Sequence, residues 1–220
     1  MKSARLMTVT TIAAALAAIV AGAVPASAGG RLPPPASRAV ASARPAGQAA
    51  PARLRAAFPA DTISCFDQQS LAANANSDYV SAELGYTGAS YGMLRARATT
   101  IGPWEKFDFC HDVTQGWWAI SSDANGLYVT AQFGYPGASF GELTASSSII
   151  GPYQKWVLGC VPGSPVGPQI EFVTIQAQTN LNYVSTEIGY TGASYAMLRA
   201  RAATAGPWEK YFNPSGFLCG

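Results

Sequence analysis

Aromatic side chains recur at fixed spacing between residues 86 and 208, and they are the groups best suited to hold a ligand. Flat rings with a polar tip stack on the faces of sugars, and loops on a rigid scaffold present them well. The predicted ligand-binding residues are Tyr86, Tyr91, Trp104, Tyr135, Phe140, Tyr190, Tyr195 and Trp208. The alternative role for each of these rings is packing at the end of a barrel. Trp117, Trp118 and Trp156 lie in apolar segments and are predicted to be core residues.

Groups that could perform acid–base or nucleophilic chemistry are scarce. The single histidine, His111, stands between Cys110 and Asp112, and no serine lies in a nucleophile motif. Glycoside cleavage needs two opposed carboxylates, whereas acids repeated around a pseudo-three-fold axis are set apart. The nearest two cysteines are 45 residues apart, which excludes a zinc site built from close pairs. We therefore expect no enzyme activity, no metal site and no cofactor.

The four cysteines, an even number, predict two disulfides in a secreted chain. The favoured pairing is Cys65–Cys110 with Cys160–Cys219, because the strand after Cys65 is expected to run antiparallel to the strand ending in Cys110. The alternative pairing is Cys65–Cys219 with Cys110–Cys160.

The N-terminus predicts export. Lys2 and Arg5 precede an Ala-rich apolar stretch and the small-residue site Ala26-Ser27-Ala28, so residues 1–28 are predicted to be a signal peptide and the protein to be extracellular. A membrane anchor is the alternative, but a span needs about 20 apolar residues. Residues 29–60 are rich in Ala, Pro and Arg, and are predicted to be a disordered linker or pro-segment.

The remaining residues, 61–220, are predicted to form one acidic domain. They hold seven Lys and Arg against all twelve Asp and Glu, which gives a net charge of −5, whereas residues 1–60 carry seven basic residues. Nucleic-acid binding needs a basic face, so no nucleic-acid partner is expected. No stretch after the signal peptide is long and apolar enough to cross a bilayer, so no stable membrane insertion is expected.

A repeat dominates this domain. Residues 79–107 return as 128–156 and as 183–211, at offsets of 49 and 55 residues, and the first and third copies match at 23 of 29 positions. We call these segments repeats one, two and three. In repeat two, Tyr153 is the counterpart of Trp104 and Trp208.

Each repeat predicts short strands joined by polar and Gly-rich turns. In repeat one, Leu94 and Ala96 are expected to point inward and Arg95 and Arg97 outward, and the last strand is expected to start at Trp104. Three such units must hide their strand edges, and a propeller usually needs at least four blades. The sequence therefore predicts an all-β protein, a β-trefoil of three internal repeats.

Charged residues differ between the repeats as a set. Glu83, Arg95, Arg97 and Glu105 of repeat one have charged counterparts in repeat three. Repeat two has neutral residues at these positions, namely Gln132, Thr144, Ser146 and Gln154. Acids and bases that vanish together predict ion pairs across neighbouring strands. The alternative is a charged ligand site present only in repeats one and three.

The runs Tyr79-Val80-Ser81-Ala82-Glu83, Leu94-Arg95-Ala96-Arg97 and Gly102-Pro103-Trp104-Glu105-Lys106-Phe107 resemble the fascin-like β-trefoil repeat, and in particular its secreted actinobacterial members. The resemblance covers 61–220. It implies a non-catalytic binding module whose partner is a glycan or cell-wall polysaccharide. The alternative is a protein partner, as for an inhibitor of a secreted hydrolase or an extracellular cross-linking protein.

Overall fold

The structure is a computed structural model that describes residues 62–163 and 171–219. The predicted signal peptide and linker, residues 1–28 and 29–60, lie outside the described residues. The described part consists of strands and short 3-10 turns, so the all-β prediction is confirmed. Within these ranges no helix has the length and apolar character that a membrane span requires.

The strands follow the three repeats. The first set is β1 (Ile63–Gln69), β2 (Ala72–Ala73), β3 (Tyr79–Glu83), β4 (Met93–Ala98) and β5 (Phe107–Asp112). The second set is β6 (Trp117–Ser122), β7 (Tyr128–Gln132), β8 (Glu142–Ser147) and β9 (Trp156–Pro162). The third set is β10 (Glu171–Ala177), β11 (Tyr183–Glu187), β12 (Met197–Ala202) and β13 (Tyr211–Phe212).

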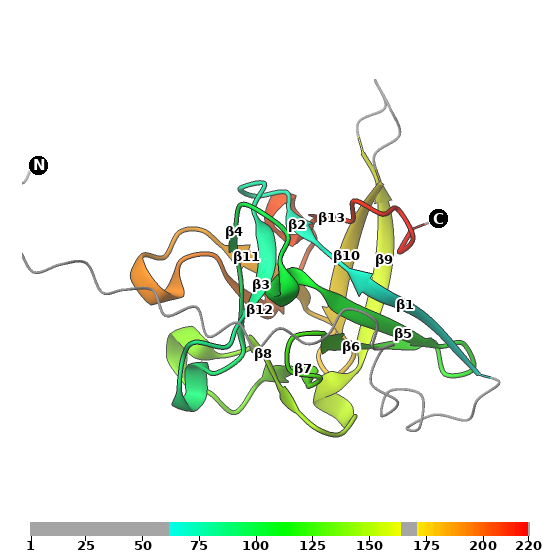
Figure 1. The fold of residues 1–220 in the computed structure, drawn as a ribbon, viewed down its shortest axis with the longest axis horizontal. Helices are drawn as coiled ribbons and strands as arrows, with labels where there is room; N and C mark the ends of the chain where they lie inside the picture. Colours follow the sequence, from blue (N-terminus) through cyan, green and yellow to red (C-terminus); the bar gives the residue numbers. More distant parts are fainter. Residues whose placement is uncertain (1–61, 164–170, 220) are drawn as a thin grey trace, which may run out of the picture. The chain divides into compact units, whose positions relative to one another are not determined.

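Six strand positions close a barrel. β1 pairs with β5, β5 with β6, β6 with β9, β9 with β10 and β10 with β13, and β13 returns to β2. β1 and β2 together fill one position, because β1 pairs with β5 and, after a break at residues 70–71, β2 pairs with β13. The barrel strands lie to the right in Figure 1.

Three hairpins, β3–β4, β7–β8 and β11–β12, cover one end of this barrel. Each hairpin pairs with both others, through β4–β8, β8–β12 and β12–β4. A six-stranded barrel with a triangle of hairpins is the β-trefoil that the repeat predicted. The hairpin loops contain the 3-10 turns η1 (Gly88–Ser90), η3 (Gly137–Ser139) and η5 (Gly192–Ser194), which gather to the left in Figure 1.

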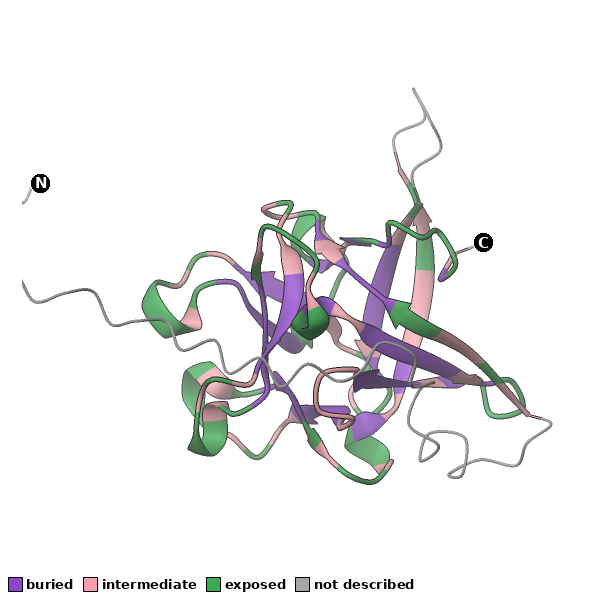
Figure 2. Ribbon diagram, in the orientation of Figure 1, coloured by how far each residue is buried: buried purple, intermediate pink, exposed green. Residues whose placement is uncertain are grey.

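The core fills the barrel and the inner faces of the hairpins. Val80, Ala82, Leu94 and Ala96 are buried as the alternation predicted, and so are their counterparts in the other repeats. Trp117 and Trp156 are buried, whereas Trp118 is only half-buried against the core. In Figure 2 the exposed hairpin loops lie to the left of the buried strands.

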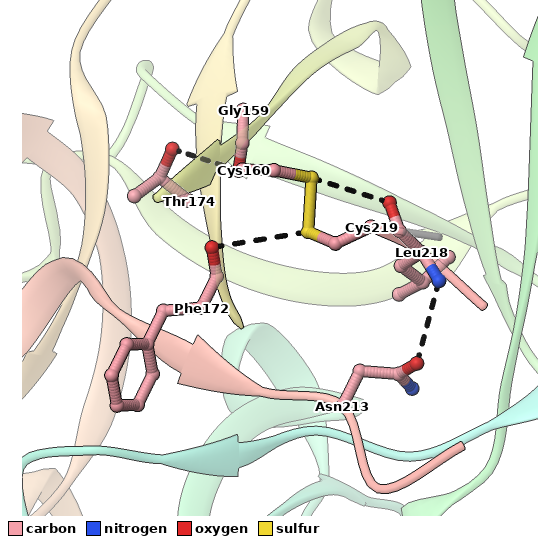
Figure 3. Close-up of a disulfide and its surroundings, with 7 residues drawn as sticks. All are labelled: Gly159, Cys160, Phe172, Thr174, Asn213, Leu218 and Cys219. Atoms are coloured by element: carbon pink, nitrogen blue, oxygen red, sulfur yellow. Dashed lines mark hydrogen bonds between the residues drawn. A yellow bond between two sulfur atoms is a disulfide. The ribbon is translucent and has the colours of Figure 1, made fainter. Parts of the chain in front are cut away.

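Both disulfides have the favoured pairing. Cys65 and Cys110 face each other in register on β1 and β5, and Cys160 of β9 is joined to Cys219. Figure 3 shows the second bridge beside Phe172 and Leu218, where the Leu218 N–H donates to Asn213 Oδ1 at 3.5 Å. Two disulfides are consistent with an oxidising, extracellular setting.

Two predictions about the turn that begins at Gly102 are wrong. The last strand begins at Phe107, because Pro103–Glu105 form the 3-10 turn η2, and η4 (Pro152–Gln154) and η6 (Pro207–Glu209) repeat it. The Glu105 carboxylate accepts a hydrogen bond from the Gly102 N–H at 2.7 Å and closes this turn, so it does not pair with an arginine. Gln154 closes the equivalent turn through Gly151, which explains why the charge is dispensable in repeat two.

Candidate functional site

Buried polar and charged residues gather where the three hairpins meet. Arg95 was predicted to point outward, but it is 3% exposed because the neighbouring hairpin covers it. Its Nε donates to the carbonyl of Tyr195 at 2.9 Å and its Nη2 to the carbonyl of Gly192 at 3.2 Å. An arginine of repeat one therefore holds the hairpin loop of repeat three.

Equivalent contacts join the repeats around the pseudo-three-fold axis, and we call the three junctions seams. Seam one joins repeats one and three through the Ala96 N–H and the Ala196 carbonyl at 2.9 Å. Seam two joins repeats three and two through Ala200 and Gly141 at 2.8 Å, and seam three joins repeats two and one through Ala145 and Gly92 at 2.7 Å. Each seam is built from the outer face of one hairpin and the loop of the next.

Ion pairs stand in two of the three seams, as predicted. Arg97 binds Glu83 through Nε and Nη2, and Arg201 binds Glu187 in the same geometry at 2.6 and 2.8 Å. These hydrogen bonds raise the pKa of both arginines. The two carboxylates are buried, whereas the side chains of Arg97 and Arg201 remain 44% and 40% exposed.

Seam three is neutral. Gln132 Nε2 donates to Thr144 Oγ1 at 2.6 Å and to Ser146 Oγ at 3.3 Å, which confirms the predicted substitution of an ion pair by a hydrogen-bonded set. Short polar side chains thus keep the register of this hairpin without burying charge.

Seam two differs from seam one in the residues around its buried arginine. Arg199, 1% exposed, lies 3.1 Å from Glu187 Oε2 and faces Glu142 in the cross-strand register. In seam one Arg95 faces Met197 instead. Burial raises the pKa of the Glu142 carboxyl, and the positive charge of Arg199 partly opposes this effect.

Three of the predicted site residues lie at the seams and make structural contacts. The hydroxyl of Tyr86 accepts a hydrogen bond from Arg95 Nη1 at 3.0 Å, and the ring of Tyr190 lies 4.6 Å from the guanidinium of Arg199. Interaction with Arg199 lowers the pKa of Tyr190. The Tyr135 hydroxyl donates to the carbonyl of Ala89 in repeat one at 3.4 Å. All three tyrosines are half-buried.

The other predicted rings are exposed. Each repeat presents one from its hairpin loop and one from its second 3-10 turn: Tyr91 with Trp104, Phe140 with Tyr153, and Tyr195 with Trp208, at exposed fractions from 37% to 50%. In repeat two, Phe133 packs against Phe140 at 5.5 Å and against Tyr153 at 5.9 Å. We call each exposed pair a platform. The counterparts of Phe133 in repeats one and three are Leu84 and Ile188, which are also apolar.

Sequence reasoning missed a row of stacked rings on the barrel. Phe66 stacks on Trp118 at 6.0 Å and on Phe217 at 6.5 Å, and Trp118 stacks on His111 at 4.5 Å. These rings come from three strands and the C-terminal segment, so no local pattern could reveal them. His111 is engaged in this stack, and the Asp112 carboxylate accepts hydrogen bonds from Thr114 and Gln115.

The comparison with solved structures supports the fold. No protein-family model and no curated protein matches the chain. A designed three-fold symmetric protein, ThreeFoil, is similar over 66% of this chain and 96% of its own, with a TM-score of 0.51 and 14% identity. A mosquitocidal holotoxin is similar over 66% of this chain with a TM-score of 0.52 and 9% identity, and the match spans 17% of the toxin chain. At these identities the likeness establishes the β-trefoil fold alone.

Proposed function

We propose that this protein is a secreted, non-catalytic binding module of the fascin-like group, and that its target is a carbohydrate or cell-envelope polymer. The observation that supports this proposal is the platform, a pair of exposed rings that recurs in all three repeats. Exposed rings on turns held by a rigid barrel suit the apolar faces of sugars.

The platforms, and not the seam tyrosines, are the proposed binding surfaces. The hydroxyls of Tyr86 and Tyr135 have hydrogen-bond partners and the ring face of Tyr190 lies against Arg199, so all three side chains are already engaged in contacts of the fold. Trp104, Tyr153 and Trp208 instead remain 43% to 50% exposed on the 3-10 turns η2, η4 and η6.

Three weak platforms on one domain act together on a polymer. When one platform is bound, a second meets the same chain at a high effective concentration, so retention can exceed the single-site affinity by about 100-fold or more. The proposed ligand is therefore a polysaccharide rather than a single sugar.

The test is retention on insoluble polysaccharides. Replacing Trp104 and Trp208 by Ala should reduce retention at least about tenfold, because two of the three platforms lose a ring. The melting temperature should shift by only a few degrees, since exposed substitutions change stability by about 0.5 kcal/mol each. Ile149→Ala is the matched control, because Ile149 is a 71% exposed apolar side chain outside the platforms. Unchanged retention of the double variant would refute the platforms as binding surfaces.

A protein partner is the second candidate, as an inhibitor of a secreted hydrolase or a cross-linking protein. Phe217, at the end of the stacked row on the barrel, is 61% exposed and favours this candidate, because exposed rings mark protein interfaces. A stoichiometric complex with a secreted hydrolase in co-purification, lost in Phe217→Ala, is the result that would favour it.

A further inference from the structure

The three seams differ in net charge. Seam one contains Arg95, Arg97 and Glu83, which sum to +1. Seam two contains Arg199 and Arg201 with the carboxyl groups of Glu187 and Glu142, so two basic residues stand with two acidic ones. Seam three holds the neutral set around Gln132. Although all three seams have one backbone plan, only the first has more basic than acidic side chains among the described residues.

Arg95 is the source of this excess charge. Its three nitrogens donate only to neutral oxygens, namely the Tyr86 hydroxyl and the carbonyls of Gly192 and Tyr195. Within the described ranges no carboxylate lies at ion-pair distance from its guanidinium, and Met197 occupies the position that Glu142 holds in seam two. A buried charge without a counter-charge is unfavourable, so this seam favours an anion nearby.

Arg97 supplies the exposed contact beside that charge. Glu83 holds its Nε and Nη2 and so fixes the guanidinium plane, while 44% of the side chain stays open to solvent. A fixed, exposed guanidinium is the usual protein partner of carboxylate and sulfate oxygens. The exposed Tyr195 belongs to the loop that Arg95 clamps, so a platform residue lies at the same seam.

We propose that seam one binds the anionic group, carboxylate or sulfate, of an acidic polysaccharide, and that Arg97 makes the contact while Arg95 supplies the field. This inference rests on the proposed function, since the sugar chain itself would be held by the platforms. The net charge of residues 61–220 is −5, so the domain as a whole repels polyanions and any preference for them must be local.

The chain supplies its own matched variants. Met197→Glu copies into seam one the acid of seam two, and Glu142→Met copies into seam two the residue of seam one. Both side chains already occur at equivalent positions of the same fold, so both variants should fold. Arg97→Ser copies Ser146 of repeat two and removes the exposed contact.

The experiment measures affinity for polygalacturonate and for its methyl ester, a neutral polymer with the same backbone, with dextran sulfate and dextran as the sulfate pair. The wild type should prefer the acidic member of at least one pair by about tenfold or more. Met197→Glu and Arg97→Ser should abolish that preference and leave binding of the neutral polymer unchanged. Glu142→Met should raise the number of anion sites from one to two.

The outcomes separate this inference from the proposed function. Equal binding of acidic and neutral polymers, or a preference that survives Met197→Glu, would overturn the anion site and leave glycan binding standing. Binding of sodium sulfate in titration calorimetry, lost in Arg97→Ser but without retention on any polymer, would support the anion site and refute the polysaccharide. Binding of neither polymers nor sulfate would overturn both.

Discussion

The hairpin loop of repeat one contains three glycines that should respond very differently to alanine. Gly85 has an ordinary backbone conformation and open space around it, so Gly85→Ala should stabilise by about 0.5 kcal/mol through the unfolded chain. Gly88 also has open space but a φ of +64°, so Gly88→Ala should destabilise by about 1 kcal/mol.

Gly92 adds a steric clash to the same backbone requirement. Its φ is +71°, and an added Cβ would lie 2.5 Å from the carbonyl oxygen of Ala145 in repeat two. The clash displaces the backbone that carries the 2.7 Å hydrogen bond between Ala145 and Gly92. The positive φ costs about 1 kcal/mol, the weakened hydrogen bond about 1 kcal/mol and the overpacking about 1 kcal/mol, so Gly92→Ala should lose about 3 kcal/mol. Ala196 occupies the equivalent position in repeat three with a φ of +55°, so the variant should still fold.

Urea unfolding with the disulfides intact tests this series. With a slope of about 2 kcal/mol per M, the midpoint should fall by about 1.5 M for Gly92→Ala and about 0.5 M for Gly88→Ala. It should rise slightly for Gly85→Ala. Equal losses at Gly88 and Gly92 would refute the close approach of the first two hairpins, because only the backbone conformation would then matter.

Three further variants probe the core and the disulfides. Cys219→Ser opens the disulfide whose cysteines are 59 residues apart. The free energy of unfolding should fall by about 4 kcal/mol, because the bridge restricts the unfolded chain. A loss under about 1 kcal/mol would contradict this chain-entropy model. Because burial raises the pKa of Glu142, its ionisation opposes folding; Glu142→Gln should match the wild type in urea unfolding below about pH 4 and be the more stable of the two near pH 7. A wild type that gains stability relative to this variant as the pH rises would show the opposite sign. Tyr211→Phe should lose about 1 to 2 kcal/mol, because it leaves the buried Thr186 hydroxyl without its 3.2 Å partner. Adding Thr186→Ala should recover part of this loss, since Phe107 already occupies the equivalent site of repeat one. Additive losses of the two substitutions would argue against the pair.

The sequence was informative wherever a feature repeats. Three in-phase copies predicted the trefoil, and the exchange of Glu83 and Arg97 for Gln132 and Ser146 predicted the ion pair and its neutral substitute. These predictions succeeded because a repeat compares each position with two others in the same fold. The pairing of Cys65 with Cys110 followed instead from the expected antiparallel strands.

The burial of Arg95 could not be predicted from strand alternation. Alternation separates the two faces of one hairpin, but it does not reveal that a second hairpin covers the outer face. The pattern did contain a signal, because Gly92 and Gly141 mark close approach between backbones at the edges of the same strands. The start of the last strand was also misplaced, since Gly102 and Pro103 begin a 3-10 turn in which Trp104 becomes exposed.

The triangle of hairpins makes the number of repeats part of the fold. In a stacked array each repeat contacts only its neighbours, so copies can be added or removed at the ends. Here every hairpin contacts both others and the barrel closes from β13 to β2, so a single copy can be neither inserted nor lost without opening the whole domain. Such a protein is free to diversify only within its copies. The exchanges at Glu142 and Thr144 are of this kind, and they give three seams of one design different sets of charged and polar side chains.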